Sequence, residues 1–312
     1  MRGWIVGIVL LGAGCTGMDP VPAVTAEELT GSVGVLHLER DHDPAGPELG
    51  RTLLRAAFAR YEGVDGQEVM RILRTAAPAG PGDCAWDAAE DGVTDLVSAG
   101  SGADVELLDV GALRIRVAET EARLTPRTFP DLASVIAGVF YAGDAELAMP
   151  RAERDEYRIE AEGSADVGAF EVVVPAPAAP ANLALVGEDG TSARLDEAGG
   201  RWTEVSRTGA LTVLWDAEDL TDTVEVELTA QGVTLACTAM DEGSLVLDAE
   251  LLAALPADFD ASLTVRRVRT TPFDAPGLGT AYARVGAVGT FALWLVGPAV
   301  GEGPADDVEA LP

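Results

Sequence analysis

Short runs in which hydrophobic and polar residues alternate recur along most of the chain. In the clearest run, residues 223–230, aliphatic side chains alternate with glutamates and a threonine. Side chains two positions apart share one face of a strand, so this run predicts a strand with one buried and one solvent-exposed face. Gln231 and Gly232 mark a turn, and residues 233–238 alternate again with Cys237 on the buried side. Together the two runs predict a β-hairpin.

The same two-residue period predicts strands elsewhere, at residues 113–117, 157–162, 170–174, 211–215, 263–268 and 291–295. A short helical turn is predicted from Ala249 to Leu255, with Asp248 as its cap and Pro256 at its end. Two stretches, 51–61 and 67–75, fit either a helix or a strand. Their β-rich surroundings favour a strand for both.

Proline-rich and polar segments divide the chain. Three prolines within residues 175–180 cannot continue the interior of a sheet, so they predict a domain boundary. We therefore expect a β-rich domain at 31–175, a Pro/Ala linker at 176–182 and a β-sandwich at 183–300. A disordered acidic tail is expected at 301–312. The predicted fold class is mainly β, with two sandwich domains.

Trp215 followed by a core-facing Cys237 resembles the tryptophan and second cysteine of an immunoglobulin-like sandwich. The usual partner cysteine on an earlier strand of that domain is missing, as it is in fibronectin-like sandwiches. The run 237–256, with Leu251 to Pro256 at its end, is similar to a segment of predicted myxobacterial-type surface lipoproteins. This resemblance implies a fold class and a cellular address but no activity.

The N-terminus has the parts of an export signal. Arg2 precedes an apolar run at 4–11, which is too short to span a bilayer as a helix. Ala13, Gly14 and Cys15 then resemble the lipobox of bacterial lipoproteins, whose cysteine carries a lipid. Position 12 departs from that pattern, because a glycine stands where the family has a leucine-type residue.

The lipobox resemblance implies a signal peptide at 1–15, a lipid on Cys15 and a tether at 16–30. Thr16, directly after the cysteine, resembles the outer-membrane sorting signal of better-known envelope systems. We therefore expect an exported protein held at the outer membrane or cell surface, with a free periplasmic or secreted protein as the alternative.

Charge limits the partners. The chain has 52 acidic and 21 basic residues, a formal net charge of −31. Nucleic acid is a poor partner, because its phosphates are neutralised by Lys and Arg. The expected partners are the membrane, through Cys15, and an envelope protein or polysaccharide.

If Cys15 carries a lipid, Cys84 and Cys237 remain as a pair. An exported protein permits a disulfide between them. A disulfide requires the two Cα atoms to lie within about 7 Å, and the sequence alone does not show their separation. The alternative is that Cys237 is a small buried residue and Cys84 a free thiol.

Candidate metal ligands are few. His37 and His42 are the only histidines, and a site with Asp41 or Asp43 is conceivable, but five positions along a strand point the two rings to opposite faces. A solvated strand end is favoured. Acidic loops at 90–95 and 216–222 offer oxygen ligands for Ca²⁺, but neither has EF-hand spacing, and solvated loops are favoured. We expect neither a bound metal nor a cofactor.

No sequence motif of a catalytic centre lies in a convincing context. The expected function is therefore non-catalytic: binding, adhesion or scaffolding by a lipid-anchored envelope protein. Two alternatives stay open. One is an exported hydrolase that uses a pair of carboxylates, at least one with a raised pKa. The other is an adhesion module stabilised by Ca²⁺.

Overall fold

The computed structural model describes residues 30–41, 49–72, 82–88, 104–132, 136–148, 150–152, 154–194, 203–256 and 259–296. Cys15, His42, the loop at 90–95 and the two terminal segments predicted as signal and tail lie outside these residues. Strands make up 63% of the structure and helices 5%, which confirms a mainly β fold. No helix of the described ranges is long and apolar enough to cross a membrane.

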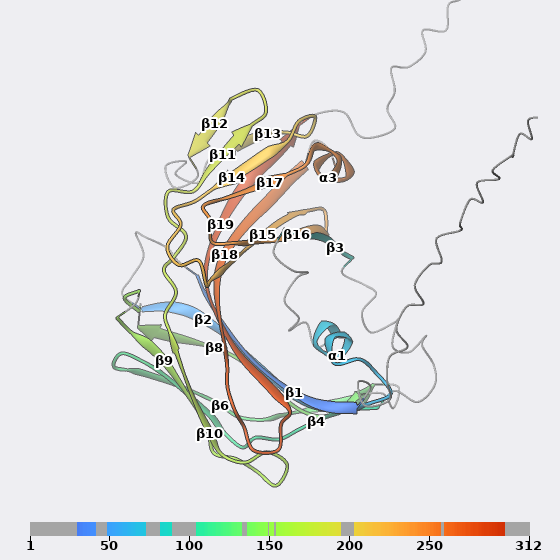
Figure 1. Cartoon of the computed structure of the whole chain (residues 1–312), viewed down its shortest axis with the longest axis vertical. Helices are drawn as coiled ribbons and strands as arrows, with labels where there is room; N and C mark the ends of the chain where they lie inside the picture. Colours follow the sequence, from blue (N-terminus) through green and yellow to red (C-terminus); the bar gives the residue numbers. More distant parts are fainter. Residues whose placement is uncertain are drawn as a thin grey trace, which may run out of the picture.

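Eleven strands form one long, curved sheet that runs the length of the molecule (Figure 1). Along the sheet the order is β3 (Cys84–Ala88), β16 (Val233–Met240), β15 (Thr223–Ala230), β18 (Phe259–Pro272), β19 (Thr280–Val296), β1 (Thr30–Asp41), β2 (Leu49–Glu62), β4 (Asp104–Leu107), β8 (Ile136–Ala148) and β7 (Arg127–Leu132). The eleventh strand, β13 (Thr203–Ser206), pairs with β19.

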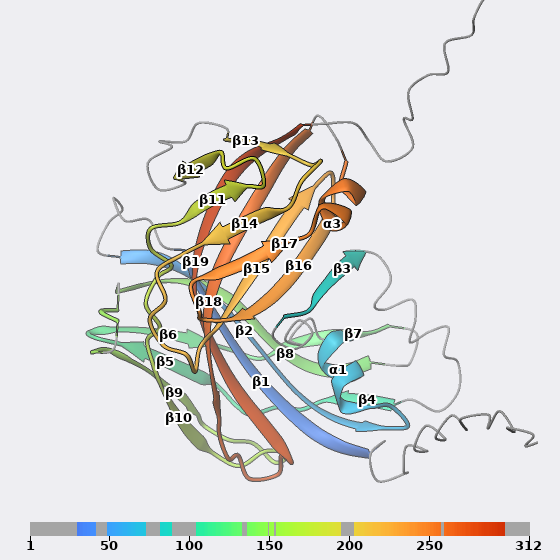
Figure 2. The same cartoon turned by 45° about the horizontal axis from the view of Figure 1, so that its top comes forward.

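Two four-stranded sheets cover parts of the long sheet. The first contains β10 (Phe170–Pro175), β9 (Glu156–Ala161), β5 (Leu113–Val117) and β6 (Thr120–Leu124). The second contains β12 (Ser192–Arg194), β11 (Ala184–Gly187), β14 (Leu211–Leu214) and β17 (Ser244–Leu247). Both lie on one side of the long sheet, while helix α1 (Gly66–Ile72) lies on the other side (Figures 1 and 2). The short helix α3 (Ala249–Ala254) follows β17.

Strand β19 contributes to both cores with the same face. Ala283 and Val285 belong to the core under the β5–β6–β9–β10 sheet. Leu293 and Leu295, an even number of residues further on, belong to the core under the β11–β12–β14–β17 sheet. Because residues two apart on a strand share a face, the two small sheets form two sandwiches on one shared sheet.

The boundary between the two cores lies near the predicted linker, whereas the long sheet continues across that boundary. The buried residues of the first core lie at or before Ala176, apart from Ala275, Ala283 and Val285, and the buried residues of the second core lie at or after Leu183. Strands from both sides of the linker nevertheless pair directly: β1 lies parallel to β19, and β3 lies antiparallel to β16. The halves therefore share backbone hydrogen bonds as well as a linker.

Most predicted strands are present, including the hairpin of β15 and β16. Gln231 and Gly232 form its turn with φ of 50° and 81°, the left-handed conformation that two-residue hairpin turns require. The stretch 51–61 lies in β2, as predicted.

The strand prediction for 67–75 was wrong for residues 67–72, which lie in helix α1, and residues 73–75 lie outside the described residues. This helix begins after Asp65, whose carbonyl accepts the Val69 amide, and Val69 is buried in a third cluster beside β1 and β4. The predicted turn at 249–255 is α3, although the Asp248 side chain makes no capping hydrogen bond.

Candidate functional site

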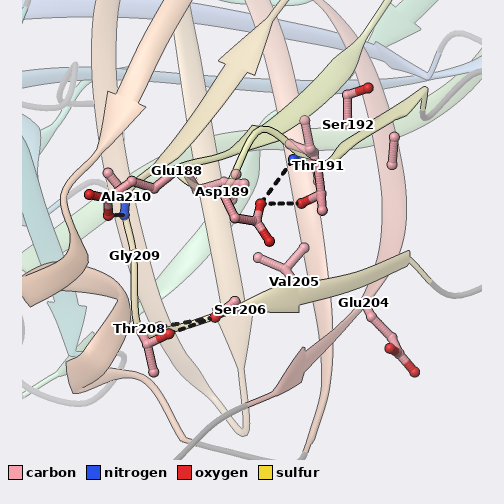
Figure 3. A pocket seen from close by; sticks show the side chains of 14 residues that line it. Glu188, Asp189, Thr191, Ser192, Glu204, Val205, Ser206, Thr208, Gly209 and Ala210 are labelled. Carbon is pink, nitrogen blue, oxygen red and sulfur yellow. Dashed lines mark hydrogen bonds between the residues drawn. The ribbon is translucent and has the colours of Figure 1, made fainter.

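An open cavity of about 620 Å³ lies at the second sandwich (Figure 3). Its walls come from β11, β12, β13 and the turns that join β11 to β12 and β13 to β14. Leu185, Val205 and Leu211 contribute to it from the buried core, while hydroxyl and carboxylate groups come from the turns. The cavity is therefore open to water, with a polar rim above the edge of an apolar core.

The first turn holds its shape through its own side chains. Asp189 Oδ1 accepts hydrogen bonds from the Thr191 amide at 2.9 Å and from the Thr191 hydroxyl at 2.6 Å. Gly190, between them, has a φ of 80°, which glycine adopts at little cost. The sequence Asp-Gly-Thr thus fixes the position of one carboxylate at the cavity.

The second turn faces the first across the cavity. The hydroxyls of Ser206 and Thr208 lie 2.9 Å apart (Figure 3). The two turns are joined by the Ala210 amide, which donates to Glu188 Oε2 at 3.3 Å. In Figure 3 the hydroxyls of Ser206 and Thr208 lie across the cavity from the Asp189 carboxylate, so the rim carries hydrogen-bonding groups on both sides.

The cavity is negatively charged. Glu188, Asp189 and Glu204 line it, and none of its described lining residues is basic. The hydrogen bonds from Thr191 lower the pKa of Asp189 below its usual value, so this carboxylate is ionised at neutral pH. An anion would be repelled here, whereas a ligand with many hydroxyl donors meets carboxylate and hydroxyl acceptors.

His37, the only histidine in the described part of the chain, lies elsewhere, on β1. Its Nε2 is 3.5 Å from Glu39 Oε1, and it faces Arg284 on β19 and Arg55 on β2 across the sheet. Burial, followed by the charges of Arg284, Arg266 and Arg55, lowers its pKa to about 3. The imidazole is therefore neutral at neutral pH. His42, the other histidine of the candidate metal site that the sequence disfavoured, lies outside the described residues.

His37 and Glu39 border a group of buried ion pairs that the sequence did not reveal. Arg266 contacts Glu39 at 2.6 Å, Glu225 at 3.2 Å and Glu227 at 2.9 Å. Arg284 also pairs with Glu225. The prediction that the glutamates of β15 face solvent was wrong for Glu225, which is 4% exposed, because arginines on β18 and β19 neutralise it within the sheet.

The loop at 216–222, a candidate calcium site that the sequence favoured less than a solvated loop, uses aspartate carboxylates in contacts within the protein. Asp222 and Asp219 pair with Arg269, at 2.7 Å and 2.9 Å. Asp219 also accepts bonds from the amide and hydroxyl of Thr221. No group of three or more His, Cys, Asp or Glu residues in the described ranges is arranged to hold a metal ion.

Cys84 and Cys237, which the sequence left as either a pair or two separate thiols, form a disulfide across β3 and β16. It links positions 153 residues apart and fixes the short strand β3 to the end of the long sheet. Trp215 lies in the second core, and its ring N–H donates to Asp241 Oδ1 at 2.7 Å.

Comparison with known proteins gives no relative from which a function could be transferred. No protein-family model matches the chain, and no curated protein matches it.

Proposed function

We propose that the chain is a lipid-anchored protein of the bacterial cell envelope that binds a polyhydroxylated ligand, such as a segment of envelope polysaccharide, without catalysing a reaction. The observation that carries the binding role is the open cavity between the β11–β12 and β13–β14 turns. It presents an ionised carboxylate opposite two hydroxyls, and its described lining residues include no histidine, cysteine or arginine.

The chemistry of the rim favours sugar hydroxyls over other ligands. Carboxylate oxygens accept two hydrogen bonds each, and Ser and Thr hydroxyls both donate and accept. The rim of an open cavity exchanges its water readily, so a long polymer can lie across it without threading. The net charge of −31 adds a general repulsion of polyanions and favours a neutral or amino-containing polysaccharide.

Two further features support the cellular address. The first is the lipobox-like sequence that ends at Cys15, together with the short apolar run before it. The second is the disulfide, because such bonds persist in oxidising compartments such as the periplasm and the cell surface. We also propose that the second sandwich is immunoglobulin-like, and the positions of Trp215 and Cys237 support this assignment.

Calorimetric titration of the full chain with purified envelope polysaccharides tests the binding role. Asp189→Asn keeps an oxygen acceptor for Thr191 but removes the charge, and Thr208→Val removes a hydroxyl with little change in shape. We expect each to weaken binding by about tenfold, the loss of one charge-assisted or neutral hydrogen bond. Asp166→Asn, an exposed control in the first sandwich, should bind as the wild type does. Equal affinity of all four proteins would contradict the proposal.

The proposed location at the membrane is tested separately by membrane fractionation and by mass spectrometry of the mature N-terminus. The wild type should be recovered with the outer membrane, with a diacylglycerol-modified Cys15 as its first residue. Cys15→Ser should lose the membrane association. A wild-type protein with an intact Met1 in the cytosolic fraction would contradict the anchor.

A further inference from the structure

Arg40, near the end of β1, is a buried arginine that has no carboxylate partner among the residues the structure describes. Only 3% of its surface is exposed. Its Nη1 donates to the backbone oxygens of Leu147 at 3.0 Å and Ala148 at 2.8 Å, and lies 3.5 Å from the Thr52 hydroxyl. Within the described part of the chain, its Nε and Nη2 have no well-aligned hydrogen-bond acceptor.

Other buried arginines show what is missing at Arg40. Arg266, Arg267 and Arg284 each pair with at least one carboxylate. Arg207 has none, but its guanidinium binds two carbonyls at the end of α3, where the helix dipole is negative. At Arg40 the described residues supply two backbone carbonyls to Nη1 but no carboxylate. A buried charge is costly unless it is paired with an opposite charge, so the remaining donors of this guanidinium suit an anionic group.

A cavity of about 220 Å³ adjoins Arg40 at the junction of the two cores. Tyr157 is its other polar lining residue. The remaining wall is apolar and includes Pro150, Pro177 and Ala287. Cavities that bind small molecules concentrate at such junctions between packed units. The volume equals that of roughly seven liquid water molecules at about 30 Å³ each.

Hydrogen bonds from Arg267 hold in place the part of the cavity wall that the linker forms. Arg267 Nη1 donates to the carbonyls of Ala178 and Ala179, at 3.1 Å and 3.2 Å. Ala179 and Pro177 line the cavity. The linker between the two sandwiches is therefore a fixed side of this cavity.

Tyr157 supplies a second donor. Burial raises the pKa of its hydroxyl, and the charge of Arg40 together with a hydrogen bond to Arg40 opposes that rise without cancelling it. The hydroxyl therefore keeps its proton at neutral pH and can donate it in a hydrogen bond.

We propose that this cavity binds the carboxylate of a small organic acid. The carboxylate pairs with the Arg40 guanidinium, which offers planar, two-point recognition, and accepts a hydrogen bond from Tyr157. A short aliphatic tail of the acid packs against the prolines and alanines of the wall. From the volume, an acid of about four to seven non-hydrogen atoms fits, which includes propionate and butyrate.

The test is thermal unfolding and calorimetric titration of the full chain with sodium propionate and sodium butyrate. Sodium chloride at matched ionic strength and propionamide, which has the same shape without the charge, serve as reference ligands. A ligand that binds only the folded chain raises the melting temperature. We expect a rise of about 2–4 °C at saturating propionate or butyrate, and no rise with either reference.

Three variants locate the effect. Arg40→Met should lower the affinity for propionate by more than about tenfold, the loss of a charge-assisted pair. Ala287→Leu keeps Arg40 but fills the cavity, and should also abolish the response, so the test stands even if Arg40→Met fails to fold. Arg51→Gln, an exposed arginine on β2, is the matched control and should respond as the wild type does.

Two results would overturn the proposal. One is an equal response to propionate in the wild type and in Ala287→Leu. The other is the absence of any response of the wild type up to about 100 mM acid, a concentration at which even millimolar affinity saturates the site. Neither result bears on polysaccharide binding at the second sandwich, because the two cavities share no lining residue.

Discussion

Arg267 on β18 and Asp241 after β16 form an ion pair in the interior of the second sandwich, with Nε and Oδ2 3.0 Å apart and both side chains 0% exposed. Asp241 also accepts the ring N–H of Trp215 and the backbone amides of Glu218 and Asp219. The pair therefore joins the shared sheet, the second core and the acidic loop, and every oxygen of the carboxylate has a partner.

Removal of Asp241 should destabilise the protein strongly. Asp241→Ala leaves Arg267 buried and unpaired, a change that typically lowers the free energy of unfolding by about 3–5 kcal/mol. Chemical denaturation with urea measures the loss. Glu242→Ala, the exposed neighbour, is the control and should change stability by less than about 0.5 kcal/mol. If Asp241→Ala lowers the free energy of unfolding by less than about 1 kcal/mol, the ion pair does not contribute to stability as a buried pair should.

The stability of the chain should fall on acidification because of His37. Burial and three arginines lower its pKa from 6.5 to about 3 in the folded protein, so between these values only the unfolded chain takes up the proton. Its contribution to stability is full above pH 6.5 and decreases by up to about 1.4 kcal/mol per pH unit below it. The measurement is urea denaturation at pH 7 and pH 5.

The substitution His37→Gln removes this titration and should flatten the dependence of stability on pH in that window. NMR of the imidazole provides the direct reading, since the His37 ring should stay neutral down to pH 4. Ring resonances that titrate between pH 6 and 7 would show that burial and the surrounding arginines do not lower the pKa of His37 as described.

The disulfide should contribute measurable stability and leave no reactive thiol in the folded body. In a Cys15→Ser background, a thiol reagent should find no free cysteine until the protein is unfolded and reduced. Reduction should lower the free energy of unfolding by about 2–5 kcal/mol, mainly through the freedom gained by the unfolded chain. Cys84→Ser is the control, because a reductant should not change its melting temperature. A reductant effect of equal size in both proteins would argue against the pairing.

The shared sheet predicts one cooperative unfolding transition. Ile159→Ala in the first core and Leu263→Ala in the second remove side chains that are 0% exposed. Each should lower the same melting transition, at a cost of about 2–5 kcal/mol, because strands β18 and β19 extend through both sandwiches. Differential scanning calorimetry checks this. Two separate transitions, each moved by only one variant, would show that the halves unfold independently.

The periodicity of the sequence predicts strands but not their partners. Alternation located the β15–β16 hairpin and the strand at 211–215, because each of these patterns is local. The pairing of β1 with β19 joins residues almost 250 positions apart, and no local pattern encodes it. A strand's two faces can be read from its residues, whereas its neighbour in the sheet is set by the packing of the whole chain.

The buried charges show the same limit in the candidate sites. Glu225 alternates with valines, as a solvent-facing residue does, and its partner Arg284 lies 59 positions away. Arg40 likewise occupies an alternating strand position, and its missing partner becomes apparent only from the contacts around it. At the open cavity, the Asp-Gly-Thr sequence at 189–191 is a local turn motif that can be recognised in the sequence. It predicts a turn but not a cavity, because the same motif forms turns in many contexts. Helix α1 was missed because its seven residues are too few for a periodic pattern to outweigh the β-rich surroundings.

The most direct test of the binding role is to map the contact of an envelope oligosaccharide on the isotope-labelled chain by NMR. The account predicts chemical-shift changes at the amides of residues 188–192 and 206–210, with the first sandwich unaffected. Changes confined to other surfaces, or none with any envelope oligosaccharide at millimolar concentration, would contradict it.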